Sequence, residues 1–241
     1  MRPVHILAKR EDIAEKVITA GDPERVKQVA SYLDEAKLVN ENRGLLVYTG
    51  EYKGVPVTIA THGIGAPSAN IVFEELRMLG AKVIIRLGTA GSLHEKIRVG
   101  DFIVVSGAAY IHGGNSIGMY VPGCCMPTAP SPDVTVELIR EAEALGEKVF
   151  LGPVFSSDAF YAEDPEFVST WSKRGVLAVE MECAGLFSLG WLRGFKTGAL
   201  LVISDTLVGI KTEMLTAKEL APRVEKASKV VLNTIVKIDV S

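Results

Sequence analysis

The chain has 241 residues, of which 48% are hydrophobic, so it is long enough to bury a substantial core. With 26 lysines and arginines against 29 aspartates and glutamates, its net charge of −3 excludes the basic footprint of a nucleic-acid-binding protein. Its apolar runs are far shorter than the ~18–20 residues of a membrane span, and the N-terminus lacks the apolar stretch of a signal peptide, so we expect a cytoplasmic protein without membrane contact.

Apolar runs alternate with helical patterns along the chain, and no linker or repeat divides residues 1–241, which we expect to form one domain. The first half is predicted to contain a strand at 17–20, a helix at about 23–33, a hairpin of strands 45–49 and 55–60 around a turn at 51–54, and a helix at 68–79.

The second half is predicted to contain strands at 83–87, 102–105, 149–151, 154–155, 177–179 and 199–203, with helices at about 135–145, directly after 182 and at about 218–235. Several of these strands are almost continuous apolar runs, which are typical of a sheet covered by helices on both faces. The pattern therefore predicts the α/β class with a central, mostly parallel or mixed sheet.

The cysteines Cys124, Cys125 and Cys183 are too few for a disulfide framework, and their spacing does not match a metal site. Cys183 is expected to be a small core residue. Cys124 and Cys125 are either exposed loop thiols or partners in a disulfide between subunits, which cytosolic proteins of hyperthermophiles tolerate. The single glutamine, Gln28, indicates a thermophilic source, because thermolabile amides are depleted in such proteins.

Polar residues follow several apolar runs, at the strand ends where ligands of open α/β sheets bind. After the first strand, Gly21 allows a ligand to approach the backbone, while Asp22 and Pro23 suit a helix start whose free amides favour an anion. Arg25 in the first turn opposes the helix dipole unless an anion lies between them. The alternative is an ordinary strand-to-helix turn with a solvated arginine.

A second cluster begins with Arg86, which lies within a run of Val, Ile and Leu where an unpaired charge is costly. It needs an acidic partner or a bound anion, and the small residues that follow at 88–92, Thr89 among them, could cradle an oxyanion. Arg43 is either a surface loop charge or a third cation. Three arginines and a threonine would suit one phosphate dianion, because guanidinium matches phosphate geometry.

Carboxylates form the remaining clusters. Glu180 and Glu182 stand two residues apart and could accept hydrogen bonds from the vicinal diol of a ribose, although paired acids also suit a glycosidase. Metal binding is disfavoured because no histidine is adjacent. Asp205 ends the most apolar strand and is either a proton donor whose pKa is raised by burial or the cap of a following helix.

Together these clusters resemble the nucleoside phosphorylase family that contains the hexameric purine-nucleoside and methylthioadenosine phosphorylases. The resemblance covers nearly the whole chain in order and rests on seven motifs, at 21–25, 41–44, 61–65, 86–89, 156–161, 179–182 and 204–205. It implies an α/β sandwich around a distorted, partly barrel-like mixed sheet flanked by helices. It also implies a homo-hexamer, built as a trimer of dimers, with active sites shared between subunits.

The resemblance further implies a role for each motif residue. Phosphate, a co-substrate, would be bound by Gly21, Arg25, Arg86 and Thr89, with Arg43 from a neighbouring subunit. The purine nucleoside would be bound by His5 from that neighbour and by Ile64, Phe160, Glu180, Met181, Glu182 and Ser204. Glu182 would hold the ribose hydroxyls, Phe160 would stack on the base, and Asp205 would protonate N7 of the departing purine. No cofactor or metal is expected.

Three features bear on the substrate. Bacterial purine-nucleoside phosphorylases carry an arginine downstream of the aspartate, and here the nearest basic residue that aligns is Lys218. The Gln-x-Arg pair of uridine phosphorylases is missing after Phe160 and Tyr161, which disfavours pyrimidines. The apolar loop 207–210 would suit the methylthio group of 5′-methylthioadenosine. The order of preference among adenosine, inosine, guanosine and methylthioadenosine stays open.

Three other functions compete with phosphorolysis. A nucleosidase of the same fold would use water, but such enzymes lack the arginine set present here. A nucleoside-binding protein without activity would have lost Asp205 or the arginines. A glycosidase that acts on oligosaccharides would need a groove lined by aromatic residues, which make up only 7% of this chain and are scattered.

Overall fold

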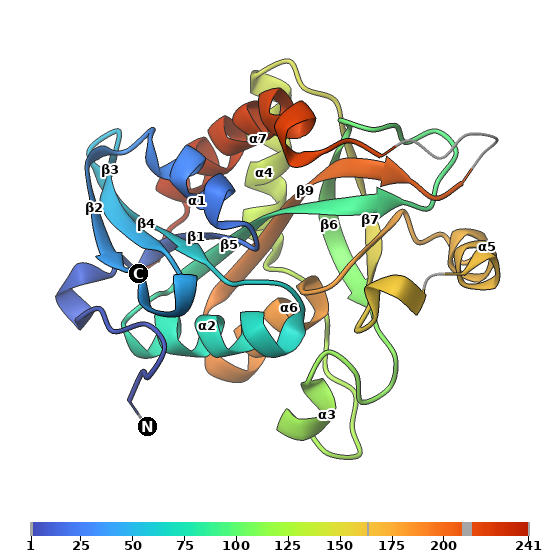
Figure 1. The fold of residues 1–241 in the computed structure, drawn as a ribbon, viewed down its shortest axis with the longest axis horizontal. Coiled ribbons are helices and arrows are strands. Elements are labelled where there is room, and N and C mark those ends of the chain that lie inside the picture. Colours follow the sequence, from blue (N-terminus) through green and yellow to red (C-terminus); the bar gives the residue numbers. More distant parts are fainter. Residues whose placement is uncertain (1, 163, 209–213, 241) are drawn as a thin grey trace.

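The computed structural model describes residues 2–162, 164–208 and 214–240 (Figure 1). Their strands form a mixed nine-stranded sheet in the order β2-β3-β4-β1-β5-β8-β7-β6-β9. The strands are Lys16–Ala20 (β1), Asp34–Asn40 (β2), Val47–Tyr52 (β3), Val55–Thr61 (β4), Val83–Ser92 (β5), Phe102–Ala109 (β6), Val149–Ser156 (β7), Ala178–Glu180 (β8) and Lys196–Thr206 (β9).

Helices lie on both sides of this sheet (Figure 1). They are Pro23–Ala30 (α1), Ala66–Met78 (α2), Ile117–Tyr120 (α3), Pro132–Ala144 (α4), Pro165–Lys173 (α5), Cys183–Arg193 (α6) and Ala217–Lys237 (α7). Together with the mixed sheet, these helices confirm the predicted α/β class. Within the described ranges, no helix is both long and apolar enough to cross a membrane.

Strand β5 belongs to two parts of the sheet at once. It pairs in parallel with β1, which leads to the open part made of β4, β3 and β2. It also pairs in parallel with β9 along its whole length, from Val83 opposite Lys196 to Ser92 opposite Thr206. Because β9 continues through β6, β7 and β8 back to β5, these five strands close on themselves, which confirms the partly barrel-like sheet.

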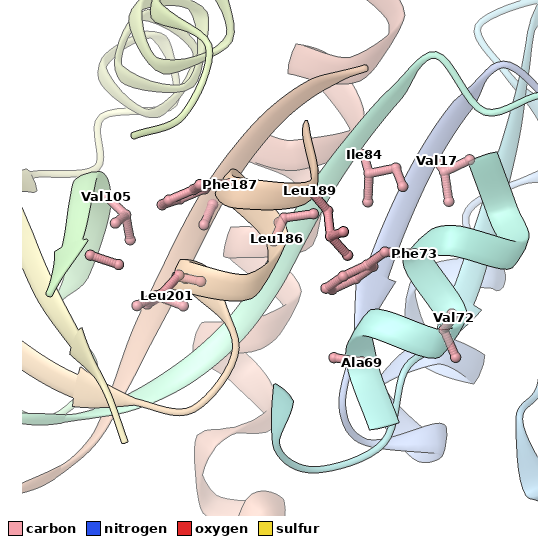
Figure 2. Packing of buried hydrophobic residues seen from close by; sticks show 14 of the residues in the cluster. Val17, Ala69, Val72, Phe73, Ile84, Val105, Leu186, Phe187, Leu189 and Leu201 are labelled. Atoms are coloured by element: carbon pink, nitrogen blue, oxygen red, sulfur yellow. The ribbon is translucent and has the colours of Figure 1, made fainter. Parts of the chain in front are cut away.

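Two apolar layers hold the helices against the sheet. Figure 2 shows the layer beneath α2 and α6, where Phe73 and Leu189 pack beside Ile84 and Val17 of the sheet. The other layer joins α1, α4 and α7 to the opposite face. Since alternate residues of a strand point to opposite faces, Ile84 and Ile85 enter different layers, and the near-continuous apolar strands follow from this arrangement.

The predicted elements differ from the structure mainly at their ends. The hairpin turn is tighter than predicted, with Lys53 and Gly54 at φ of 53° and 74° between β3 and β4. The strand predicted at 83–87 is longer than expected: residues 88–92 continue β5, because β8 and β9 pair with them despite their small side chains. Strand β2 was not predicted: it is an edge strand whose charged residues are mostly exposed.

The cysteines occupy the expected environments. Cys183 is buried at the start of α6, whereas Cys124 and Cys125 are exposed and unpaired within the chain. A disulfide between subunits stays a prediction.

Candidate active site

A cavity of about 640 Å³ opens where β1, β8 and β9 end against the small-residue half of β5. Eleven of the thirteen residues predicted for the site line it: Gly21, Arg25, Ile64, Arg86, Thr89, Phe160, Glu180, Met181, Glu182, Ser204 and Asp205. His5 and Arg43 are not among the lining residues. Residues from six of the seven predicted motifs, far apart in the sequence, thus meet around one space, and their individual roles remain predictions.

The two arginines define the cationic end of the cavity. Asp22 caps α1 by accepting a hydrogen bond from the Glu24 amide at 2.9 Å, so Arg25 lies in the first turn as predicted. Arg25 is buried, and burial together with the nearby charge of Arg86 lowers its pKa to about 10. It is therefore still a cation at neutral pH. Within the described part of the chain, it donates to the Leu87 carbonyl at 3.4 Å and makes no salt bridge.

Arg86 has acidic partners and, in addition, unused donors. Its Nη2 donates to Glu182 and lies 3.5 Å from Glu180 Oε2. Burial opposes its charge, but the carboxylate of Glu182 keeps the pKa of Arg86 raised. Among the described residues, Nε and Nη1 of Arg86 have no hydrogen-bond partner. Both predicted explanations for a buried arginine are thus compatible: it is paired with acids, and its free donors could bind an anion.

The glycines of this region make room for other groups. A Cβ on Gly88 would overlap the Arg86 guanidinium, and a Cβ on Gly21 would come within 2.9 Å of the Gly63 carbonyl. Residues 88–92 continue β5 and pair with β9, while Thr89 lines the cavity, so the expected oxyanion cradle stays a prediction. The small size of Gly88 also makes room for the Arg86 guanidinium.

The two glutamates have different hydrogen-bond partners despite their spacing. Glu180 is fully engaged at the start of α6: it accepts from the amides of Glu182 at 2.8 Å and Cys183 at 2.9 Å, and from Ser156 Oγ. Burial raises its pKa. It therefore anchors the start of α6, and because it also lines the cavity, its contact with the nucleoside stays a prediction.

Glu182 is the glutamate that combines a site position with an ionised carboxylate. Burial alone would raise its pKa, but the Arg86 guanidinium holds it below its ordinary value. Its Oε1 accepts from the Gly65 amide at 2.6 Å. An ionised carboxylate accepts further hydrogen bonds, so Glu182 is chemically suited to hold hydroxyl groups.

Asp205 lies within β9 and not at a helix cap, so the alternative reading of this residue is wrong. Burial raises its pKa, while a 2.7 Å hydrogen bond from Ser204 Oγ to Oδ1 partly opposes this. A Cβ on Gly91 would come within 2.8 Å of Asp205 Oδ2, so the carboxyl group packs directly against β5. A carboxyl group with a raised pKa in a cavity is a candidate acid.

The mouth of the cavity is apolar and exposed. Ile64 is 80% and Phe160 51% exposed, and Tyr161 contacts the Phe160 ring edge-on with 5.1 Å between centroids. Tyr161 lines the cavity but was not predicted as a site residue; its position beside Phe160 in the motif was the available signal.

His5 and Arg43 lie near one another on a separate surface. The Glu75 carboxylate accepts from the backbone amides of residues 4–6 and from His5 Nδ1 at 2.7 Å. Asn42, next to Arg43, donates from Nδ2 to the His5 carbonyl at 2.9 Å. The Asn42 bond brings the backbone next to Arg43 close to that of His5, and neither predicted residue lines this chain's cavity.

Two features that bear on the substrate are the apolar loop 207–210 and Lys218. Residues 209–210 of the apolar loop 207–210 lie outside the described residues. Lys218 is in the first turn of α7. Within the described ranges, no group of three or more metal-ligating side chains occurs.

Comparisons with known proteins identify the family. The model of the phosphorylase superfamily matches residues 15–238. The chain belongs to this superfamily. The family inferred from the seven motifs is thereby confirmed.

Similar members of the superfamily act on different nucleosides. The chain is 35% identical to guanosine phosphorylase of Halorubrum lacusprofundi over 236 residues, which cover 96% of this chain and 97% of the relative. It is 39% identical to DeoD-type purine nucleoside phosphorylase of Clostridium novyi over 217 residues, 89% of this chain and 91% of the relative.

Solved structures of the superfamily share its fold. Uridine phosphorylase of Vibrio fischeri superposes with a TM-score of 0.87 at 31% identity and covers 98% of both chains. Purine nucleoside phosphorylase of Toxoplasma gondii in complex with immucillin-H superposes with a TM-score of 0.88 at 29% identity, over 97% of this chain and 95% of that one. Because both structures fit equally well, the fold alone does not identify the base.

His62 lies within the motif at 61–65, next to the cavity-lining Gly63, but was not predicted as a site residue. It is fully buried, contacts the Phe73 ring, and places Nδ1 2.8 Å from the Gly63 carbonyl, so Nδ1 carries the proton. Burial lowers the pKa of His62 to about 4. The ring is therefore neutral at neutral pH.

This neutral histidine should make stability depend on pH. Between an unfolded pKa of 6.5 and a folded pKa of about 4, the unfolded state binds the additional proton. The contribution of His62 to the free energy of unfolding is complete above about pH 6.5. It decreases towards pH 4, by about 3 kcal/mol at most. Urea titrations should show a shallower acid loss for His62→Asn, which keeps a donor towards Gly63. Identical pH slopes for variant and wild type would contradict a neutral His62.

Arg25 offers a cleaner test of anion binding than Arg86, because replacing Arg86 would also leave the Glu182 carboxylate unpaired. Arg25→Gln should weaken binding of inorganic phosphate by about tenfold or more, since one charge-assisted contact is lost. Isothermal titration calorimetry measures this directly. Lys27→Gln is the control, because Lys27 lies on the same helix but pairs with Glu24 at 2.6 Å in solvent. Equal phosphate affinity in wild type and Arg25→Gln would rule out an anion at Arg25.

Proposed function

We propose that the protein is a purine nucleoside phosphorylase, which uses inorganic phosphate to cleave purine ribonucleosides and deoxyribonucleosides. The products would be the free base and the 1-phosphate of the sugar. The observation that carries this proposal is one cavity that contains two buried guanidinium groups, Arg25 and Arg86, an ionised Glu182, and Asp205 with a raised pKa. The cavity thus contains cations that could bind an anion, a carboxylate that could bind a diol, and an acid that could transfer a proton.

The reaction follows from this arrangement. Phosphate would bind at Arg25 and Arg86, and the ribose hydroxyls would donate to Glu182. The bond between N9 and C1′ breaks while a phosphate oxygen bonds to C1′, and Asp205 transfers its proton to N7 so that the purine leaves neutral. Such proton transfer is typically worth ~10²–10⁴ in rate. The phosphate dianion also stabilises the positive charge that develops on the ribose.

The buried cations favour phosphate over water as the nucleophile. A hydrolase of this fold would have no use for two guanidinium groups that are costly to bury. The names of the guanosine and purine nucleoside phosphorylases among the relatives support a purine base. Uridine phosphorylases carry Gln-x-Arg after this Phe-Tyr pair, and the sequence Ala162-Glu163-Asp164-Pro165 that stands there in this chain points the same way. We include 5′-methylthioadenosine among the candidate substrates because Leu207 and Val208 are apolar.

The proposed enzyme works as an oligomer in the cytoplasm, with phosphate as co-substrate and no cofactor. His5 and Arg43 would reach into a neighbouring subunit's cavity, because both lie outside their own. The exposed apolar residues Val4 (58%) and Leu7 (64%) flank His5 and suit burial against that neighbour. Three such dimers would make the hexamer.

Product analysis tests the proposal. Adenosine, inosine, guanosine, 5′-methylthioadenosine and uridine are incubated with and without phosphate, and bases and sugar phosphates are quantified. We expect purine release that requires phosphate and yields the sugar 1-phosphate. Base release without phosphate would identify a hydrolase, and no release from any nucleoside would favour a binding protein.

Asp205 should control the chemical step. Asp205→Asn should lower kcat by ~10²–10⁴, with a smaller effect on the KM for nucleoside. Because burial raises its pKa, the wild-type kcat should fall as pH rises through that value and Asp205 loses its proton. The variant should lack this alkaline fall. Asp133→Asn, at an exposed residue of α4, is the control. Unchanged turnover of every nucleoside by Asp205→Asn would remove Asp205 from this role.

A further inference from the structure

A buried asparagine outside the cavity connects the elements that carry the base and ribose sites. Asn115 lies in the segment between β6 and α4 and has no exposed surface. Its φ is 54°, in the left-handed region where asparagine is favoured over most other residues. Through its side chain and backbone it bonds to three separate parts of the chain.

On one side, Asn115 holds the segment that leads to Phe160. Its backbone N–H donates to the carboxylate oxygens of Asp158, at 2.8 and 3.1 Å. Its Nδ2 donates to Asp158 Oδ1 at 3.2 Å and to the Ser156 carbonyl at 3.3 Å. Asp158 stands two residues before Phe160, whose ring lines the cavity.

At its start the segment is also held by the Ser157 amide, which donates to the Glu180 carbonyl at 2.7 Å, and beyond Asp158 it bonds mainly to itself. The Ala159 amide donates to Ser157 Oγ at 3.2 Å, and the Ala162 amide donates to the Ala159 carbonyl at 3.0 Å. Both bonds would survive if the segment moved as a unit. Asp158 is therefore a point at which the segment carrying Phe160 is fastened to the body of the protein.

On the other side, Asn115 holds two helices that begin at the ribose site. Its Oδ1 accepts from the Gly185 amide at 3.2 Å in the first turn of α6, which directly follows Glu182. Its carbonyl accepts from Asn70 Nδ2 of α2 at 3.1 Å. The N-cap residue of α2, Gly65, donates to Glu182 at 2.6 Å.

We propose that Asn115 is a positioning residue for nucleoside binding: it sets the spacing between the Phe160 ring and the Glu182 carboxylate. These are the groups assigned above to the base and the ribose, so this inference rests on the proposed function. Asn115 does not itself line the cavity. Of the residues assigned to phosphate, Arg25 and Thr89 take no part in these bonds, whereas Arg86 pairs with Glu182. Asn115 therefore affects phosphate only through Arg86, and the nucleoside through both Phe160 and Glu182.

Asn115→Gly is the main test, because glycine keeps the positive φ and the backbone bonds while removing the amide group. We expect the KM for nucleoside to rise about tenfold, while the KM for phosphate stays within about twofold of wild type. Hydrogen–deuterium exchange should become faster at 156–161. A merely structural loss would change both KM values alike.

Asp158→Ala is the second variant, because Asp158 is exposed and its replacement leaves the core intact. It should give the same split between the KM values. The double variant should show a smaller nucleoside effect than the two single effects combined, because both remove one linkage. Met119→Ala is the control and should match wild type, because Met119 is 85% exposed and lies in the segment between β6 and α4 that contains Asn115.

The outcomes separate this inference from the function on which it rests. Wild-type phosphorolysis with an unaltered nucleoside KM in both Asn115→Gly and Asp158→Ala would overturn the inference alone. An equal rise in both KM values would also overturn it. A wild type that cleaves no nucleoside would refute the proposed function, and the inference with it.

Discussion

The buried ion pair between Arg86 and Glu182 is the interaction on which the cavity depends. A guanidinium in the interior is tolerated only with a well-placed partner, and such a pair adds little net stability. The effect of the pair is to orient the start of α6 relative to β5. Arg86 comes from the strand shared by the open sheet and the barrel, and Glu182 precedes α6, so the pair aligns a helix start with a strand. Glu180 completes this arrangement by capping α6, which leaves Glu182 free to face the cavity.

The closed part of the sheet gives this pair a rigid frame. Strand β5 has partners on both sides along most of its length, so the position of Arg86 is determined by two neighbouring ladders. Strand β9 brings Asp205 to the same frame through its pairing with β5. Arg86 and the candidate acid are thus held by adjacent strands, and neither depends on a loop for its position.

Local signals predicted much of this molecule. Apolar strands, glycine stops and polar strand ends are properties of neighbouring residues, so the α/β class and the polar lining residues at the strand ends followed from them. Only the family resemblance named the further site residues Ile64, Phe160, Met181 and Ser204. Strand β2 escaped because its charged, exposed residues lack an apolar pattern. The division of labour between Glu180 and Glu182 could not be predicted, because it depends on which one meets the amides of α6. Asn115 offered no local signal at all, since its partners lie 41 to 70 positions away in the sequence.

Two glycines of β5 restrict how this protein can vary. A methyl group at Gly88 would displace the Arg86 guanidinium, and one at Gly91 would press on the Asp205 carboxyl group. In a library of single substitutions, both positions would rank with the reactive residues in intolerance, although neither has a side chain that could take part in the reaction. Interpreting such a library by side-chain chemistry alone would therefore miss part of the active site, because these two positions contribute to it by having no side chain.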